Sequence, residues 1–306
     1  MQRNGTVAVG FDGSYASWTA LDYAATEAVL RGLDIRLVHA VLEPAAYAET
    51  ALIIPIEDAP VEARRLLAFA NNYLNRQYGD LGVRFSIGTG TAGRLLVRES
   101  RTAKLLVVGR RGRGTRTATI GSVSAYVATH SACTVLVVSA TPRSPTGPVL
   151  LGVDLATPAA SAIRFAFDAA DRHGTDLIAC HVLTATRPTA STTPTRPHHP
   201  DDLDTIRRTL EATLAQARTA YPDVPVRIEV VHDAEPAAGL LNLADTASLV
   251  VVGHHDETRA QKRTHRSVTA ALLRHTSSPV VITHATTTGA SMHSGARSVP
   301  SDIDVR

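Results

Sequence analysis

Cysteine is scarce in this sequence: only Cys133 and Cys180 occur among 306 residues. Cys133 lies beside an expected strand and Cys180 within one, both in apolar surroundings. Such positions are typical of buried small side chains in a reducing compartment. A disulfide that joins the two cysteines remains the alternative.

An excess of charge is missing as well. The sequence has 31 Lys and Arg against 28 Asp and Glu, a formal net charge of +3, and this surplus is too weak to indicate nucleic-acid binding. No apolar run approaches the roughly 18 residues of a membrane-spanning helix, and the N-terminal segment MQRNGTVAVGFDGS lacks the pattern of a signal peptide. We therefore expect a cytoplasmic protein with neither nucleic acid nor a membrane among its partners.

Several nucleotide-binding and catalytic motifs are also absent. The sequence contains no GxxxxGK[ST] loop, no GxGxxG directly after its first apolar run and no GxSxG, which disfavours the enzyme classes that these motifs mark. His254 and His255 precede Asp256, but adjacent side chains point in different directions and no further ligand is near in sequence. We therefore assign no metal site.

The sequence instead contains one pattern twice. VAVGFDGS matches VLLGVDLA, which places Asp12 opposite Asp154, and IRLVHAV matches LIACHVL, which places His39 opposite His181. Later in each repeat, LLVVGRRGRGTRTATIGSVSAYV matches SLVVVGHHDETRAQKRTHRSVTAALL. Self-similarity at a nearly constant offset indicates tandem duplication of one domain.

The expected domain boundaries follow from this repeat. The length favours two domains, each large enough for its own core. Prolines and a glycine interrupt the pattern in TPRSPTGP. We assign the first domain to residues 1–143, a linker to 144–148, the second domain to 149–285 and a disordered tail with little apolar periodicity to 286–306.

Each repeat alternates strand and helix patterns. The expected strands of the first repeat are Val7 to Gly10, Ile35 to Val41, Val83 to Ile87, Leu105 to Val108 and Val135 to Val138. Helical patterns fit Ser17 to Arg31, Glu57 to Tyr78, Ala92 to Arg101 and Ser122 to His130. In the second repeat we expect strands near Val149, Leu177, Val226, Leu249 and Val280. Uniformly apolar strands separated by helices imply a parallel sheet covered on both faces, so the expected fold is α/β, with two tandem doubly wound domains.

Ligands of such sheets bind beyond the carboxyl ends of the strands. In the first repeat this rule predicts a site at Gly10 to Ser14, Ala40 to Pro44 and Gly109 to Ser124. The long segments Glu43 to Ile56 and Thr184 to Pro200 either cover a site or are solvated crossovers.

The polar loop of the first repeat has the chemistry of an anion site. Gly109, Gly112 and Gly121 allow the backbone to approach a ligand and to form a nest of N–H groups, and the helix near Ser122 adds N–H groups at its start. Arginines supply counter-charge, namely Arg110, Arg111, Arg113 and Arg116. Together these residues predict a site for a nucleoside polyphosphate. The alternative is that the glycines make only tight turns and the serine is only an N-cap.

The repeated aspartates and histidines also have structural interpretations. Asp12, followed by Gly13 and Ser14, fits a turn and N-cap pair. His39 and His181 recur at one strand position, where each can be packed or bonded to backbone, so we assign neither a ligand role.

These motifs resemble the universal stress protein family in a tandem form. The family pattern is a first strand that ends in aspartate, here VGFDGS, a histidine-containing second strand, here LVHAV, and GxxG followed by nine residues and G[ST]. The resemblance covers nearly the whole chain, twice. It implies a five-stranded domain, similar to the adenine nucleotide alpha hydrolase fold, that binds ATP with or without Mg²⁺. It also implies a pseudo-twofold pairing of Cys133 to Val138 with Pro279 to Thr283, which would remove two exposed sheet edges.

The resemblance assigns roles to matching residues. It places Asp12 and Ala40 near adenine and ribose, and it places Gly109, Gly112, Gly121 and Ser122 around the phosphates. The full set of candidate cofactor-binding residues in the first repeat is Gly10, Asp12, Ala40, Gly109, Arg110, Arg111, Gly112, Arg113, Gly114, Gly121, Ser122, Val123 and Ser124. The second, degenerate site would consist of Asp154, Gly253 and Ser267.

Both copies depart from the family pattern. In the first repeat, residues 113–120 give eight rather than nine residues before Gly121. In the second, Asp256 replaces a glycine and Arg266 replaces the glycine before Ser267. Because a carboxylate repels a triphosphate and an arginine side chain is bulky, we expect ATP to bind the first repeat and to bind the second weakly or not at all.

We expect an ATP-binding regulatory stress protein, in which occupancy changes the loop at 110–120 and so a surface for an unknown protein partner. It is not expected to be an enzyme beyond slow ATP hydrolysis, since no general base or metal carboxylate is identifiable near Ser122. One alternative is a nucleotide-independent interaction scaffold. Another is a nucleotidyl transferase or ATP pyrophosphatase, but no HxGH-like or SGGxDS-like signature occurs. We expect the two domains of one chain to pair with each other, and the sequence does not decide whether two such chains also form a homodimer.

Overall fold

The computed structural model describes residues 5–41, 59–112, 120–141, 146–184, 200–254 and 268–284. The elements of the first repeat are β1 (Thr6–Gly10), α1 (Tyr15–Arg31), β2 (Asp34–Val41), α3 (Ala59–Tyr78), β3 (Val83–Thr89), α4 (Ala92–Ser100), β4 (Leu105–Gly109), α5 (Ser122–His130) and β5 (Thr134–Val138). Those of the second repeat are β6 (Val149–Gly152), α6 (Ala160–His173), β7 (Leu177–Thr184), α7 (Pro200–Ala220), β8 (Val226–Asp233), α8 (Pro236–Ala244), β9 (Leu249–Gly253), α9 (Val268–His275) and β10 (Val280–Thr283).

The elements follow the predicted pattern. α5 begins and ends where the sequence predicts, and the other predicted boundaries of the first repeat either match or differ by one or two residues. α1 begins earlier than predicted because Ser14 is its N-cap, and the Ser14 hydroxyl accepts a hydrogen bond of 3.2 Å from the Ser17 N–H. The segment from Glu43 to Ile56, the interior of the segment from Thr184 to Pro200, and the tail 286–306 lie outside the described residues.

The strands form one continuous sheet in the order β3-β2-β1-β4-β5-β10-β9-β6-β7-β8. Neighbouring strands are parallel within each repeat, and β5 and β10 pair antiparallel at the centre, with Leu136 opposite Val281. The order therefore reads the same from both ends, as a pseudo-twofold pair requires. This confirms the α/β fold with two doubly wound repeats and the expected pairing of their last strands, which leaves no open edge between the repeats.

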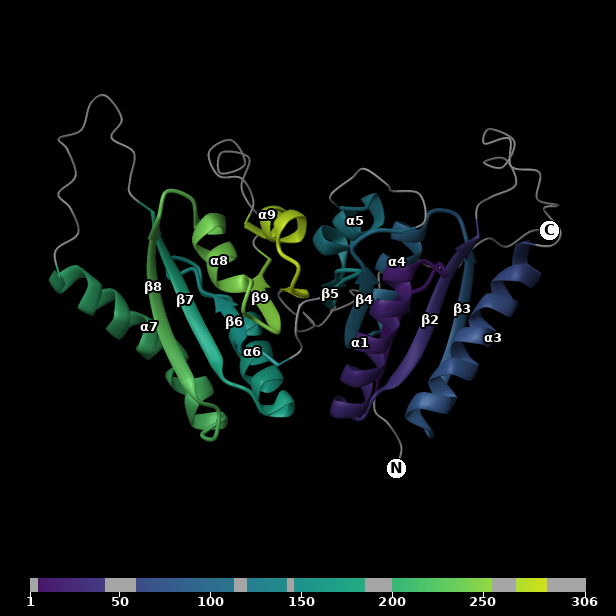
Figure 1. The fold of residues 1–306 in the computed structure, drawn as a ribbon, viewed down its shortest axis with the longest axis horizontal. Helices are drawn as coiled ribbons and strands as arrows, with labels where there is room; N and C mark the ends of the chain where they lie inside the picture. The colour runs from purple at the N-terminus through teal and green to yellow at the C-terminus, as the bar shows by residue number, and fades with distance from the viewer. Residues whose placement is uncertain are drawn as a thin grey trace, which may run out of the picture.

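The sheet has a buried core on each face. In β1, Val7 and Val9 belong to the core beneath α1 and α3, whereas Ala8 belongs to the core beneath α4 and α5. Because alternate residues are buried on opposite faces, the strand is apolar throughout. Helices α1, α3, α6 and α7 cover one face, and α4, α5, α8 and α9 cover the other (Figure 1). None of the helices in the described ranges combines the length and apolar character that crossing a bilayer requires.

Both cysteines are free thiols, so the alternative of a disulfide between them is wrong. Cys180 is buried within β7, and Cys133 is partly exposed just before β5. Burial raises the pKa of each thiol to about 12. Both side chains are therefore protonated, weakly reactive thiols at neutral pH.

Candidate functional site

The carboxyl ends of β1 and β4 meet where the strand order of the first repeat reverses. β1 lies between β2 and β4, and the helices that follow β1 and β4 cover opposite faces of the sheet. Ligands of doubly wound sheets bind at such a switch point. We call the residues gathered here the β1/β4 switch point, namely Gly10–Ser14, Gly109–Gly112 and the start of α5.

Asp12 and Gly112 follow different strands, β1 and β4, and lie close to each other. The Ser14 N–H donates to Asp12 Oδ1 at 2.9 Å, which confirms the predicted turn and N-cap pair. A Cβ added to Gly112 would lie 2.9 Å from Asp12 Oδ2, so any larger residue would displace this carboxylate. The structure thus places the residue predicted near adenine and ribose beside one predicted near the phosphates.

Gly109 has a packing role. A Cβ added at this position would lie 2.8 Å from both the backbone carbon and the carbonyl oxygen of Ala16 in α1. Real Cβ atoms do not approach backbone so closely, so the glycine lets α1 pack directly on the end of β4. Packing alone therefore accounts for a glycine at position 109, and no ligand is needed to explain it.

The start of α5 differs from its predicted form. The N-cap is Gly121, not Ser122, so the interpretation of the serine as an N-cap is wrong. Gly121 is buried and its N–H donates to the Arg110 carbonyl at 2.8 Å, whereas Ser122 is exposed. Because a glycine has no side chain with which to cap the helix, the first N–H groups of α5 receive no bond from their N-cap. This helix start can therefore bind an anion through backbone N–H groups and the Ser122 hydroxyl.

Ser124 faces the interior. Its hydroxyl donates to the carbonyl oxygens of Gly109 at 2.7 Å and Arg110 at 3.2 Å, and the residue is only 2% exposed. The side chain of Val123 packs on the core beneath α5. Of the three residues predicted at the helix start, Ser122 presents its side chain to the surface, whereas Ser124 ties the helix to the end of β4.

The described arginines of the loop point to different places. The Arg110 Nη1 donates to the carbonyl oxygen of Thr276 in the second repeat at 2.5 Å. Burial lowers the pKa of Arg110, and the neighbouring charge of Arg111 lowers it further. Arg111 is exposed. Arg113 and Gly114, also predicted to bind cofactor, lie outside the described residues, as does Arg116.

Gly10 and Ala40 lie near the ends of neighbouring strands, where Gly10 is in register with Val38 of β2. His39 precedes Ala40 in β2. Its Nδ1 lies 2.7 Å from the carbonyl oxygen of Phe11, the residue before Asp12. In the second repeat, His181 Nδ1 lies 2.8 Å from the Val153 carbonyl oxygen, and Val153 precedes Asp154. The backbone role considered for both histidines is confirmed. Their recurrence in both repeats was the signal that they fix the residue next to each aspartate.

The aspartate of the second repeat makes the same turn bond as Asp12 and also accepts from a hydroxyl. Asp154 Oδ1 accepts from the Ala156 N–H and Oδ2 accepts from the Thr157 hydroxyl, each at 2.9 Å. Both carboxylate oxygens are therefore engaged within one turn. Tyr15, which occupies the position of Thr157 in the first repeat, is 72% exposed. Gly253 ends β9 as predicted, and Ser267 lies outside the described residues.

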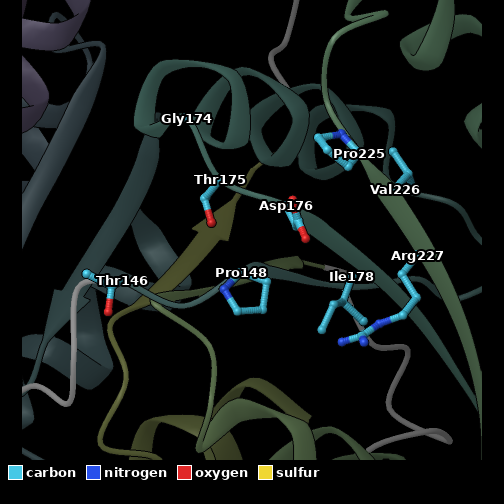
Figure 2. Close-up of a pocket in the computed structure, with 9 residues that line it drawn as sticks. All are labelled: Thr146, Pro148, Gly174, Thr175, Asp176, Ile178, Pro225, Val226 and Arg227. Carbon is cyan, nitrogen blue, oxygen red and sulfur yellow. The ribbon is translucent and has the colours of Figure 1, made fainter.

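A cavity of about 490 Å³ lies at the opposite end of the second repeat, among the amino ends of its strands. Figure 2 shows Pro148, Asp176, Ile178 and Arg227 around it. In the first repeat, Arg36 occupies the position of Ile178 and pairs with Glu99 at 3.0 Å. The second repeat thus has an apolar residue, Ile178, where the first has a paired arginine, and the cavity is separate from the β1/β4 switch point. Within the described ranges, no group of three or more His, Cys, Asp or Glu could hold a metal ion.

The sequence profile of the universal stress protein family matches residues 4–139 and again residues 146–284. The chain belongs to the universal stress protein family. It is 30% identical over 307 residues to universal stress protein Rv1996 of Mycobacterium tuberculosis, covering 92% of this chain and 95% of that one. It is 32% identical over 286 residues to a universal stress protein of Mycolicibacterium smegmatis, covering 90% and 96%.

Solved structures show the same fold. The crystal structure of a universal stress protein from Archaeoglobus fulgidus has a TM-score of 0.68 at 16% identity, covering 92% of this chain and 96% of that chain. A functionally unknown protein from Pseudomonas aeruginosa PAO1 has a TM-score of 0.59 at 13% identity, covering 91% and 92%. The chain is thus a tandem universal stress protein whose two-repeat fold is also found in these structures.

Proposed function

We propose that this universal stress protein binds ATP at the β1/β4 switch point of its first repeat and acts as a regulatory protein rather than an enzyme. In this proposal the second repeat binds ATP weakly or not at all. Occupancy of the first site favours one arrangement of the loop at 110–120 and thereby changes a surface for a protein partner. ATP acts in this way only if it binds one loop arrangement better than another.

The contact between Asp12 and Gly112 carries the proposal. A carboxylate accepts hydrogen bonds from the ribose hydroxyls or the adenine amino group of a nucleoside. A glycine beside it allows the backbone of the loop to approach the same ligand, whereas a Cβ at position 112 would lie 2.9 Å from Asp12 Oδ2 and would displace this carboxylate. The first turn of α5 supplies N–H groups for the phosphates. Groups for both halves of a nucleotide therefore meet at one place.

The proposed set of nucleotide contacts is smaller than the set that the sequence suggests. Ser122 and Arg111 are exposed and are assigned to the phosphates. Ser124 and Arg110 already donate to carbonyl oxygens and are removed from the proposed ligand set. Gly109 remains essential for packing.

The asymmetry between the repeats is supported by Asp154. Its carboxylate accepts from the Ala156 N–H and from the Thr157 hydroxyl within its own turn, so fewer of its lone pairs remain for a ribose. The sequence adds Asp256 where the first repeat has Gly112, and Arg266 where it has Gly121. A carboxylate at the position of Gly112 would repel a triphosphate, and an arginine in place of Gly121 brings a bulky side chain where the first repeat has none.

Isothermal titration calorimetry with ATP tests the proposal. The wild-type chain is expected to bind one ATP, Asp12→Asn to bind it much more weakly, and the matched variant Asp154→Asn to bind as the wild type does. Two equivalent tight sites, or an unchanged Asp12→Asn variant, would refute it. Titrations with and without Mg²⁺ decide whether ATP binds as its magnesium complex.

A nucleotide-independent interaction scaffold is the second candidate function. It is favoured by the packing role of Gly109, by the buried hydroxyl of Ser124 and by a loop one residue shorter than the family pattern. Denaturing the purified protein separates the two functions. Release of adenine nucleotide supports the ATP proposal, and failure of added ATP to bind the nucleotide-free protein supports the scaffold.

A further inference from the structure

Arg110 is bonded to three separate elements. Its N–H donates to the carbonyl oxygen of Val138 in β5 at 2.7 Å, and its own carbonyl accepts from the Gly121 N–H at the start of α5 at 2.8 Å. Its guanidinium donates to the carbonyl oxygen of Thr276, 166 residues away in the second repeat. One residue thus connects the candidate phosphate loop, the strand that joins the repeats and a helix of the other repeat.

The side chain of Arg110 does not point toward the side of the loop where the nucleotide is proposed to bind. β4 has β1 and Asp12 on one side, and β5 and β10 on the other. Thr276 follows the last residue of α9, so the guanidinium extends toward the second repeat and away from Asp12. Carbonyl groups at a helix C-terminus carry the negative end of the helix dipole. The Thr276 carbonyl is therefore a favourable acceptor for a half-buried cation.

A second contact between the repeats holds the same helix, α5. His284, just after β10, places its Nε2 3.1 Å from the carbonyl oxygen of Ala128 in α5. The N-cap of α5, Gly121, is bonded to Arg110, which is bonded to the residue that follows α9. The later part of α5 is bonded directly to His284. The helix that would bind phosphate is thus held at two points by the second repeat.

We propose that Arg110 is a positioning residue that couples the nucleotide site of the first repeat to the C-terminal end of α9. This inference rests on the proposed function and deepens it. When ATP binds at Gly109–Gly112 and the start of α5, Arg110 holds Thr276 more firmly and the last turn of α9 is stabilised. Linkage requires the reverse as well, so a partner that binds the second repeat near α9 changes ATP affinity by the same factor.

Hydrogen exchange of the full chain, measured by mass spectrometry with and without ATP, tests the coupling. In the wild type, saturating ATP is expected to slow exchange in the peptide that covers residues 268–284. In Arg110→Ala this slowing of exchange is expected to disappear even at saturating ATP. The affinity for ATP is expected to fall about fivefold, which is the lower end of the range typical of coupling between two sites. The matched control Arg111→Ala, which removes the same charge from the next position, weakens ATP binding and retains the slowing.

Three other outcomes would overturn the inference. One is slowing in Arg110→Ala at saturating ATP equal to that in the wild type. Another is wild-type binding of ATP without any change in residues 268–284. The third is loss of ATP binding in Arg110→Ala together with wild-type exchange of residues 268–284 in the ATP-free protein, which would make Arg110 a direct phosphate ligand.

The ATP-free samples keep this test separate from that of the proposed function. Without ATP, Arg110→Ala is expected to speed exchange at the end of α9, where the Thr276 N–H is bonded to Leu272, and Arg111→Ala is not. If the wild type fails to bind ATP, the proposed function fails, and this comparison alone decides whether Arg110 stabilises α9. Circular dichroism confirms that both variants are folded.

Discussion

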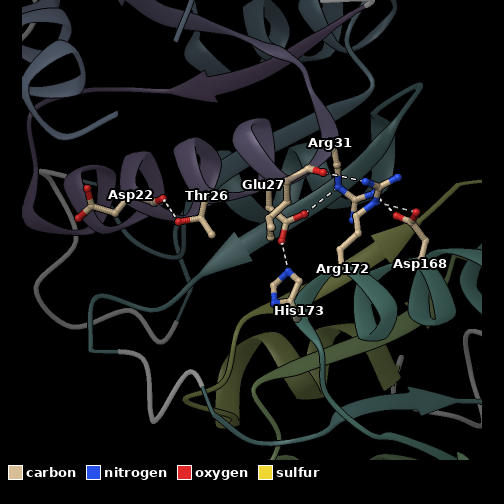
Figure 3. A network of polar contacts seen from close by, with 8 residues as sticks. Asp22, Thr26, Glu27, Arg31, Asp168, Arg172 and His173 are labelled. Atoms are coloured by element: carbon tan, nitrogen blue, oxygen red, sulfur yellow. Dashed lines mark hydrogen bonds and ion pairs between the residues drawn. The ribbon is translucent and has the colours of Figure 1, made fainter. Parts of the chain in front are cut away.

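Arg31 of α1 donates to Asp168 of α6, an ion pair that joins the two repeats on the face of the sheet opposite α5. Figure 3 shows the network around it. Arg31 Nε also donates to Glu27 at 2.8 Å, His173 Nε2 lies 2.8 Å from the other oxygen of Glu27, and Arg172 donates to Asp168 at 2.8 Å. The side chain of Glu27 is only 4% exposed. A nearly buried carboxylate is thus held by groups from both repeats.

Replacing Glu27 by glutamine is expected to destabilise the protein by about 2 to 3 kcal/mol, because it leaves a buried cation with one partner fewer while Arg31 keeps Asp168. The measurement is the free energy of unfolding in urea. The matched control is Glu62→Gln, whose partner Arg65 is 73% exposed, and it is expected to cost less than about 1 kcal/mol. Equal losses in the two variants would contradict a stabilising role for the Glu27 contacts.

The free energy of unfolding is expected to depend on pH through Glu27. Burial raises the pKa of Glu27, but the hydrogen bond from His173 and the charges of Arg31 and His173 outweigh burial and hold the pKa below its ordinary 4.5. The unfolded chain therefore takes up this proton at a higher pH than the folded chain does. The stabilisation from Glu27 is complete above pH 4.5 and is lost as the pH falls through the lowered folded pKa. The difference in unfolding free energy between wild type and Glu27→Gln should shrink over that range; a constant difference would show that Glu27 does not titrate there.

Alanine substitutions of Gly112 and Gly109 should distinguish a role in ATP binding from a role in packing. Gly112→Ala places a Cβ against the flexible carboxylate of Asp12, so we expect weaker ATP binding with little change in melting temperature. Gly109→Ala places a Cβ against the backbone of Ala16, so we expect a loss of about 1 to 3 kcal/mol in stability. Calorimetric ATP titration and thermal unfolding of both variants provide the comparison. The opposite pattern would assign Gly109 to the ligand and Gly112 to packing.

Gly121→Asp should abolish ATP binding and leave the fold intact. Aspartate is a favourable N-cap, so α5 should still form, but its carboxylate would stand where the phosphates are proposed to bind. Gly121→Ala serves as the control, because its Cβ would lie 3.3 Å from the Arg110 carbonyl oxygen, a tight contact without added charge. We expect the alanine variant to keep most of its ATP affinity. Normal ATP binding by Gly121→Asp would remove the phosphates from the start of α5.

Much of the fold is predictable because its signals are local. Buried parallel strands need apolar residues on both faces, and β1 and β4 are recognisable for that reason. The N-cap of α5 is less predictable than the range of the helix. Gly121 rather than Ser122 is the N-cap, since the bond from the Gly121 N–H to the Arg110 carbonyl closes the loop there, and no short-range pattern reveals such a bond.

The sequence by itself determined the two repeats, their α/β pattern and the segments that contribute to the switch point. Its short-range spacing of apolar residues, glycines and turn residues is enough for that. Only the tertiary structure decided which polar side chains of these segments are bonded within the protein itself. Ser124 and Arg110 carry suitable chemistry, but their hydroxyl and guanidinium donate to carbonyl groups of Gly109 and Thr276. Those partners lie 15 and 166 residues away along the chain, so the assignment depends on how distant elements pack.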